Sequence, residues 1–69
     1  MGVVIKWVNK ISKETGYVES VNTKEKHFVN TFDKNKAYEY PNAGLAKIAI
    51  GRLTAIGEAE ANDFELENV

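Results

Sequence analysis

The chain has 69 residues, a formal net charge of −1 at pH 7, no cysteine, one histidine and one proline. A chain of this length forms one domain and buries only about 60% of the surface that its unfolded form exposes, which excludes a large catalytic cleft. The lack of cysteine excludes a disulfide framework, a thiolate nucleophile and a cysteine zinc site. No apolar run approaches the roughly 18 residues of a membrane span and the start shows no secretory pattern, so we expect a cytoplasmic protein with no membrane partner.

Two β-branched and aromatic segments near the N-terminus predict a hairpin. They cover about residues 3–8 and 16–21, and a short polar connection joins them. The preferred register places a lysine opposite a glutamate and pairs apolar residues with one another. The pairs in this register are Lys6–Glu19, Val8–Tyr17 and Val4–Val21.

The rest of the chain predicts a strand, a helix and a last strand. Residues 27–32 follow a polar turn and indicate a third strand, and Asp33 is expected to cap one helical turn over residues 34–38. Asn42 caps a helix over about residues 43–56, and Gly57 follows it where a terminating glycine belongs. The apolar residues that form the main stripe of this helix recur at steps of three and four, and they are Leu45, Ile48, Ala49, Leu53 and Ile56. Residues 64–69 alternate apolar and acidic, as an edge strand does. This order predicts an α+β fold: a mostly antiparallel three- to four-stranded sheet packed against one helix.

Apolar side chains occupy both faces of the predicted sheet. Alternation places Val3, Ile5, Trp7 and Val18 on one face, and Val4, Val8, Tyr17 and Val21 on the other. A single helix covers only one face of a sheet. We therefore expect the second face to be covered as well, by a second copy of the chain, by another protein or by the chain's own residues 33–41.

The predicted helix carries two glycines seven residues apart on one strip. Each costs about 1 kcal/mol relative to alanine, so we expect a compensating close contact, preferably with the protein's own sheet or a neighbouring turn and otherwise with a partner helix. The sole arginine is the expected polar anchor for a partner, and two tyrosines before the helix add aromatic surface of the interface type. The candidate partner-binding residues are Val4, Val8, Tyr17, Val21, Tyr38, Tyr40, Gly44, Gly51 and Arg52.

Charge is spread unevenly along the chain. Residues 1–36 hold seven lysines and four acidic residues, whereas residues 57–69 hold five acidic residues and no base. Such asymmetry can indicate nucleic-acid binding, but a sequence pI of about 5.8 and a single arginine favour a solvated surface. A small nucleic-acid-binding regulator is therefore the alternative function, with contacts from Lys6, Lys10, Lys13, Lys24 and Lys26.

Few residues are candidates for catalysis or metal binding. His27 lies near Glu25 and Asp33 in the sequence, but a lone histidine beside a turn is more often exposed than catalytic or metal-ligating. The acidic residues between positions 58 and 63 lack the spacing of a calcium loop. We therefore expect no catalytic residue, no metal, no cofactor and no small-molecule substrate.

Several segments together resemble small proteins encoded by phages and prophages of low-GC Gram-positive bacteria. They are the Gly16-Tyr17-Val18 run, residues 32–40 (FDKNKAYEY), residues 48–53 (IAIGRL) and residues 63–67 (DFELE). The resemblance implies a host-directed or phage-regulatory accessory protein in the host cytoplasm, and it carries over no functional residue. With the apolar surface, it predicts a non-enzymatic protein-binding module, acting as a homodimer or as an inhibitor or adaptor.

Overall fold

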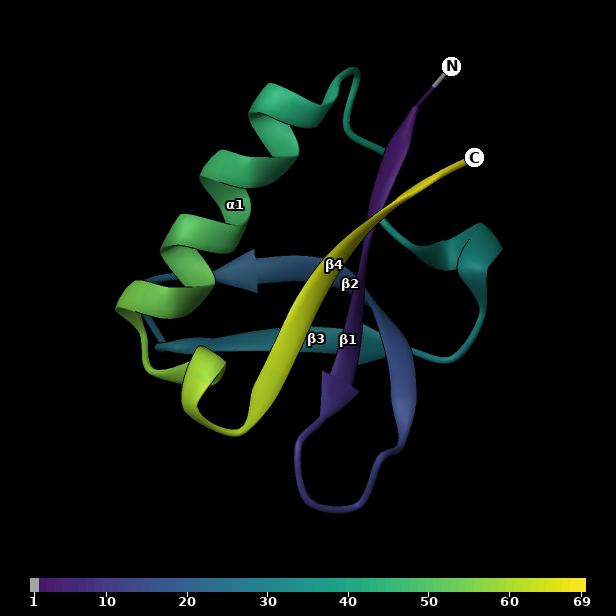
Figure 1. Cartoon of the computed structure of the whole chain (residues 1–69). Coiled ribbons are helices and arrows are strands. Elements are labelled where there is room, and N and C mark those ends of the chain that lie inside the picture. The colour runs from purple at the N-terminus through teal and green to yellow at the C-terminus, as the bar shows by residue number, and fades with distance from the viewer. Residues whose placement is uncertain (1) are drawn as a thin grey trace.

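A computed structural model describes residues 2–69 as a four-stranded sheet with one α-helix packed against it (Figure 1). The elements in chain order are β1 (Val3–Asn9), β2 (Thr15–Asn22), β3 (His27–Thr31), the 3-10 turn η1 (Lys34–Lys36), α1 (Ala43–Ala55), the 3-10 turn η2 (Glu58–Glu60) and β4 (Asn62–Asn68). The strands lie in the order β3-β2-β1-β4, and neighbouring strands are antiparallel. The predicted α+β fold, with the last strand at an edge, is confirmed.

Helix α1 begins and ends at its predicted caps. The side-chain oxygen of Asn42 accepts a hydrogen bond from the backbone amide of Leu45 at 3.0 Å. Gly57 follows the helix with φ at 89°, a left-handed conformation that glycine adopts most easily and that ends a helix. No helix within residues 2–69 is long and apolar enough to cross a membrane.

The core lies between α1 and one face of the sheet. Ile5, Val18 and Leu53 are 0% exposed there, which makes them the centre of the packing. The core cluster is completed by Val3, Trp7, Ala46 and Ala49. Helix α1 thus contributes two alanines and one leucine to the buried cluster, and Ile50 packs against it partly buried.

The β1–β2 register is shifted by two residues from the predicted one. Tyr17 pairs with Lys6 rather than with Val8, and Gly16 pairs with Trp7. A Cβ atom at Gly16 would lie 2.5 Å from the Trp7 ring, so the indole occupies space that glycine alone leaves open. Because a shift of two residues preserves side-chain alternation, the faces predicted for β1 are unchanged.

A β-bulge in β2 corrects the prediction for Val21. The register with β3 shifts between Val18 and Ser20, and the extra residue reverses the alternation that the sequence suggested. Val21 therefore packs against the helix-facing core instead of sharing the opposite face with Val4. Phe28, its partner on β3, packs against that core as well.

Residues 33–41, here called the strap, run beside β1 and β2, and Lys34 of the strap contacts Glu67 on the sheet's second face. Val3 and Tyr40 exchange two backbone hydrogen bonds of 2.9 and 2.7 Å, and the Tyr38 amide donates to a β2 carbonyl at 3.2 Å. Val4 faces away from α1 and is nevertheless 1% exposed. Of the three covers that the sequence left open, the chain's own segment is the one seen here.

Replacing Gly16 by alanine is expected to destabilise the fold, because the added methyl group would lie 2.5 Å from the Trp7 ring. Overpacking of this kind costs about 1–3 kcal/mol in the free energy of unfolding. The matched control is Gly51→Ala, whose Cβ would meet no atom within 4 Å. It should stabilise the helix by about 1 kcal/mol. Urea unfolding compares the two, and a Gly16→Ala protein as stable as wild type would contradict the observed register.

Candidate binding groove

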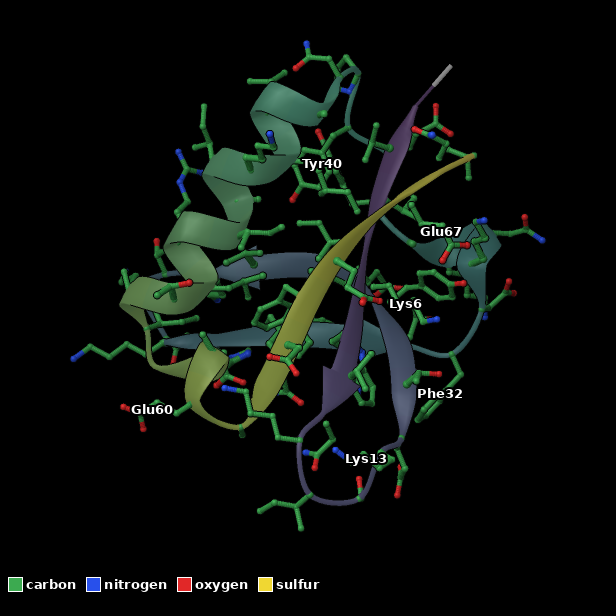
Figure 2. All side chains as sticks on the ribbon, in the orientation of Figure 1. Lys6, Lys13, Phe32, Tyr40, Glu60 and Glu67 are labelled. Atoms are coloured by element: carbon green, nitrogen blue, oxygen red, sulfur yellow. The ribbon has the colours of Figure 1, made fainter. Side chains whose placement is uncertain are left out.

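A groove of about 510 Å³ lies between α1 and the strap. Figure 2 shows Tyr40 of the strap beside the N-terminal half of α1, and both contribute to the lining of the groove. Three segments line it: Leu45, Ile48, Ala49 and Arg52 of α1, Tyr38, Tyr40 and Pro41 of the strap, and Ser20 and Val21 of β2. Segments far apart in the sequence therefore build one mainly apolar hollow.

The α1 wall of the groove leaves large aliphatic side chains partly in solvent. Its four residues follow one another at spacings of three, one and three along the helix, so they share one side. Leu45 is 45% exposed and Ile48 is 56% exposed. Ala46, Ala49 and Leu53 face the sheet, and the helix thus carries apolar residues on more than its buried side.

A tyrosine pair and one arginine give the groove its polar character. The ring centroids of Tyr38 and Tyr40 are 4.6 Å apart. Burial raises the pKa of the Tyr40 hydroxyl above its usual range, Tyr38 adds to this, and the positive charge of Arg52 opposes it. Arg52 forms no ion pair within residues 2–69, and no acidic side chain lines the groove. The groove therefore presents one cation without a counter-ion.

The structure brings four of the nine candidate partner-binding residues into this groove: Val21, Tyr38, Tyr40 and Arg52. Gly44 and Gly51 lie on the exposed part of α1 instead. The expected close contact with the sheet or a neighbouring turn is wrong for Gly51, where a Cβ would meet nothing within 4 Å. At Gly44 a Cβ would lie 3.2 Å from the Asn42 side chain in the turn before the helix. The partner-helix explanation of these glycines stays a prediction.

The remaining three candidates lie on the second face of the sheet. Val4 is buried there and has almost no surface to offer a partner. Val8 and Tyr17 are half-buried. Sequence reasoning missed Leu45 and Ile48 as groove residues, because their helical spacing assigned them to the core. The signal that could have placed them outside is the pair of small residues, Ala46 and Ala49, beside them on the helix.

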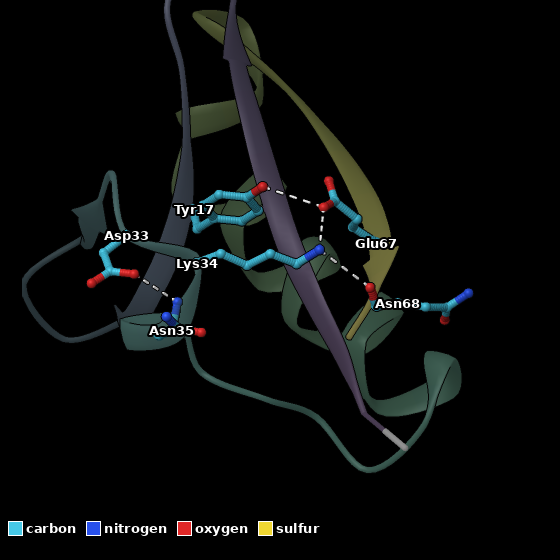
Figure 3. A network of polar contacts seen from close by, with 6 residues as sticks. All are labelled: Tyr17, Asp33, Lys34, Asn35, Glu67 and Asn68. Carbon is cyan, nitrogen blue, oxygen red and sulfur yellow. Dashed lines mark hydrogen bonds and ion pairs between the residues drawn. The ribbon is translucent and has the colours of Figure 1, made fainter.

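A polar network on the second face joins the strap to β2 and β4 (Figure 3). The Tyr17 hydroxyl donates to the Glu67 carboxylate at 3.3 Å, and the Lys34 ammonium group donates to the same carboxylate. Lys34 also donates to the backbone carbonyl of Asn68 at 3.3 Å. The hydrogen bond with Lys34 lowers the pKa of Glu67, and the same bond raises the pKa of Lys34. Val4 pairs with Glu67 on this face, which places it at the network.

The turn η1 presents Lys34 to this network. The Asp33 carboxylate accepts a hydrogen bond from the Asn35 amide at 2.9 Å and so begins the turn, as the sequence predicted (Figure 3). The turn covers Lys34–Lys36 rather than residues 34–38, because the chain then becomes extended at Ala37 and continues to its bridge with Val3.

The five lysines of the nucleic-acid alternative lie in three places. Lys6 is on the second face between its register partners Tyr17 and Glu65. The β1–β2 loop holds Lys10, 3.9 Å from Asp63, and Lys13, whereas the β2–β3 turn holds Lys24 and Lys26. Figure 2 shows Lys13 in the hairpin loop, away from Lys6. The loop and the turn sit at opposite ends of an eight-residue strand, about 25 Å apart along it, so the lysines do not form one basic patch.

His27 lies exposed at the start of β3. Asp33 follows the other end of that strand, about 20 Å away along an extended chain. The strand therefore separates the histidine from this carboxylate. Among residues 2–69, no three His, Asp or Glu side chains are grouped so as to hold a metal ion.

Comparison of the chain with protein-family models, curated proteins and solved structures finds no match. The functional argument therefore proceeds from the groove, its exposed apolar residues and its unpaired arginine.

Replacing Glu67 by glutamine should weaken the fold at neutral pH. The pKa of Glu67 is lowered in the folded chain, so its stabilising effect is present above the ordinary value of 4.5 and is lost as the pH falls through the lower folded value. Glu60→Gln is the matched control, since Glu60 forms no ion pair within residues 2–69. Thermal unfolding between pH 7 and pH 3 should show a deficit for Glu67→Gln that closes with acidification; a deficit independent of pH would contradict the network.

Replacing Arg52 by glutamine should raise the pKa of Tyr40 further, because the positive charge that favours the ionised phenol is removed. Carbon NMR of the tyrosine rings during an alkaline titration measures this pKa directly. Lys47→Gln removes a charge from the same helix outside the groove and should leave it unchanged. Equal shifts in the two variants would show that Arg52 does not lie beside Tyr40.

Proposed function

We propose that this chain is a non-enzymatic module that binds another protein through the groove between α1 and the strap. One observation carries the proposal: Tyr38, Leu45 and Ile48 meet in this groove and are each about half exposed, at 54%, 45% and 56%. Large apolar side chains gathered in a hollow and left in contact with water are typical of surfaces that a partner covers. Covering them would remove apolar area from water, which is the main driving force of association.

The composition of the groove supports a protein partner. Tyrosine and arginine are enriched among the residues that contribute most to binding between proteins. Here two tyrosines and Arg52 line the groove together with the aliphatic side chains of α1. Aromatic residues and arginine beside apolar side chains are typical of protein interfaces.

The resemblance to phage and prophage proteins supports a more specific role. Residues 32–40 carry part of that resemblance, and they include Tyr38 and Tyr40, which line the groove. The pattern and the binding surface thus coincide in the strap. We extend the proposal accordingly to an accessory protein that acts in the host cytoplasm by occupying a host or phage protein, as an inhibitor or adaptor.

Replacing Ile48 by aspartate tests the groove as the binding surface. The charge would lie at the centre of the apolar wall, and we expect it to weaken binding by at least about tenfold, because a buried, unpaired carboxylate strongly opposes association. Proteins captured from a bacterial lysate by the wild-type chain would be purified, and their affinities for wild type and variants measured by titration calorimetry.

The matched control for this test is Lys47→Asp, the adjacent position on α1 but outside the groove lining. It should bind each purified partner with an affinity close to that of wild type. Partners that bind Ile48→Asp as tightly as wild type, or a wild-type chain that binds no protein, would overturn the proposed function.

A further inference from the structure

We infer that the occupant of the groove is an acidic amphipathic helix of a partner protein. This inference rests on the proposed function and adds the chemistry of the partner. It is carried by the unpaired guanidinium group of Arg52, by the backbone hydrogen bonds of the strap and by the spacing of the apolar residues on α1.

The charge of the groove selects an acidic partner. Arg52 is the only charged residue of the lining and has no ion pair within residues 2–69. A guanidinium group binds carboxylates through two parallel hydrogen bonds, and beside an apolar surface such bonds are stronger than in open water. A partner that places an aspartate or glutamate next to its apolar anchors therefore completes the groove.

The same charge argument disfavours a second copy of this chain. Helix α1 (AGLAKIAIGRLTA) contains a lysine and an arginine but no acidic residue. Two α1 helices packed against each other would bring cations together without a carboxylate to pair them. Like charges across an interface oppose association.

The hydrogen bonding of the strap backbone favours a helix over an extended peptide as the occupant of the groove. Backbone groups of Tyr38 and Tyr40 already bond to β2 and β1, so this wall of the groove offers mainly side chains. An extended peptide gains its affinity from backbone hydrogen bonds to a free strand edge, whereas a helix satisfies its own backbone. A helix can thus enter the groove without losing hydrogen bonds.

The length of the apolar wall fits two turns of such a helix. Leu45, Ile48 and Arg52 span about 10 Å along α1 at 1.5 Å per residue. A partner helix with apolar residues at i, i+3 and i+7 covers the same length, and an acidic residue near one end then reaches Arg52. The aromatic wall of Tyr38 and Tyr40 would contact the opposite side of that helix.

A display experiment tests the inference. Yeast cells would carry a library of helical peptides with leucine fixed at i, i+3 and i+7 and charged residues randomised at the remaining positions. The library would be sorted against wild-type protein, Arg52→Glu, Ile48→Asp and the control Lys47→Glu. All four proteins would first be compared by urea unfolding, and the substituted positions are exposed, so we expect them to fold.

Wild type and Lys47→Glu should enrich peptides with an acidic residue at the end of the apolar stripe. Changing that residue to lysine should weaken binding by at least about tenfold, because the charge-assisted hydrogen bonds to Arg52 are lost. Arg52→Glu should reverse the preference and enrich basic peptides. Ile48→Asp should enrich none.

The outcomes separate this inference from the proposed function. Peptides that bind wild type but not Ile48→Asp, without preference for acidic residues, would overturn the acidic partner and leave the groove as a protein-binding surface. Retained binding after a proline is placed mid-peptide would overturn the helix. A wild-type dimer in sedimentation that Ile48→Asp dissociates would place a second copy in the groove. If wild type enriches no peptide above Ile48→Asp, both the inference and the proposed groove are overturned.

Discussion

One 13-residue helix cannot cover both faces of a four-stranded sheet, and the rest of this structure depends on how the chain meets that constraint. Helix α1 covers one face, and the strap runs beside β1 before α1 begins, with Lys34 bonded to Glu67 on the other face. Two backbone hydrogen bonds between Val3 and Tyr40 hold the strap to β1, and the bond of Lys34 to Glu67 holds it to β4. The nine residues that precede the helix cap thus complete the sheet's packing.

The same segment creates the groove. After it has bonded to β1, the strap turns at Pro41 into α1, which leaves Tyr38 and Tyr40 beside the helix wall. The sequence predicted surplus apolar side chains on the second face of the sheet. In the structure Val4 on that face is buried, and the exposed aliphatic side chains of the groove lie on α1 instead. The strap thus has two roles. Its Lys34 lies at the second face, where Val4 is buried, and its two tyrosines form one wall of the groove.

Local signals predicted much of the fold, since each depends on residues close together in the sequence. Asn42 and Gly57 bound the helix, alternation identified the strands, and the acidic last strand lies at an edge as expected. The register of β1 with β2 was not predicted, because it depends on the fit of the Trp7 indole over Gly16. The bulge before Val21 likewise depends on pairing with β3.

The groove was predicted only in part, for a similar reason. Tyr38, Tyr40 and Arg52 were recognised by residue type, but their meeting depends on the bonds of the strap to β1 and β2, which no local pattern specifies. Leu45 and Ile48 have the spacing of core residues, and only the packed structure shows that smaller alanines take the buried side of the helix.

The central claim is that the strap is an integral part of the sheet and forms a fixed wall of the groove. Amide hydrogen exchange followed by NMR tests it most directly. The Tyr38 and Tyr40 amides, which bond to β2 and β1, should be protected to an extent similar to that of Ile5 in the middle of β1. Exchange of both amides as fast as that of residues 23–26 in the β2–β3 turn would contradict the account, because the second face would then lack its cover and the groove its wall.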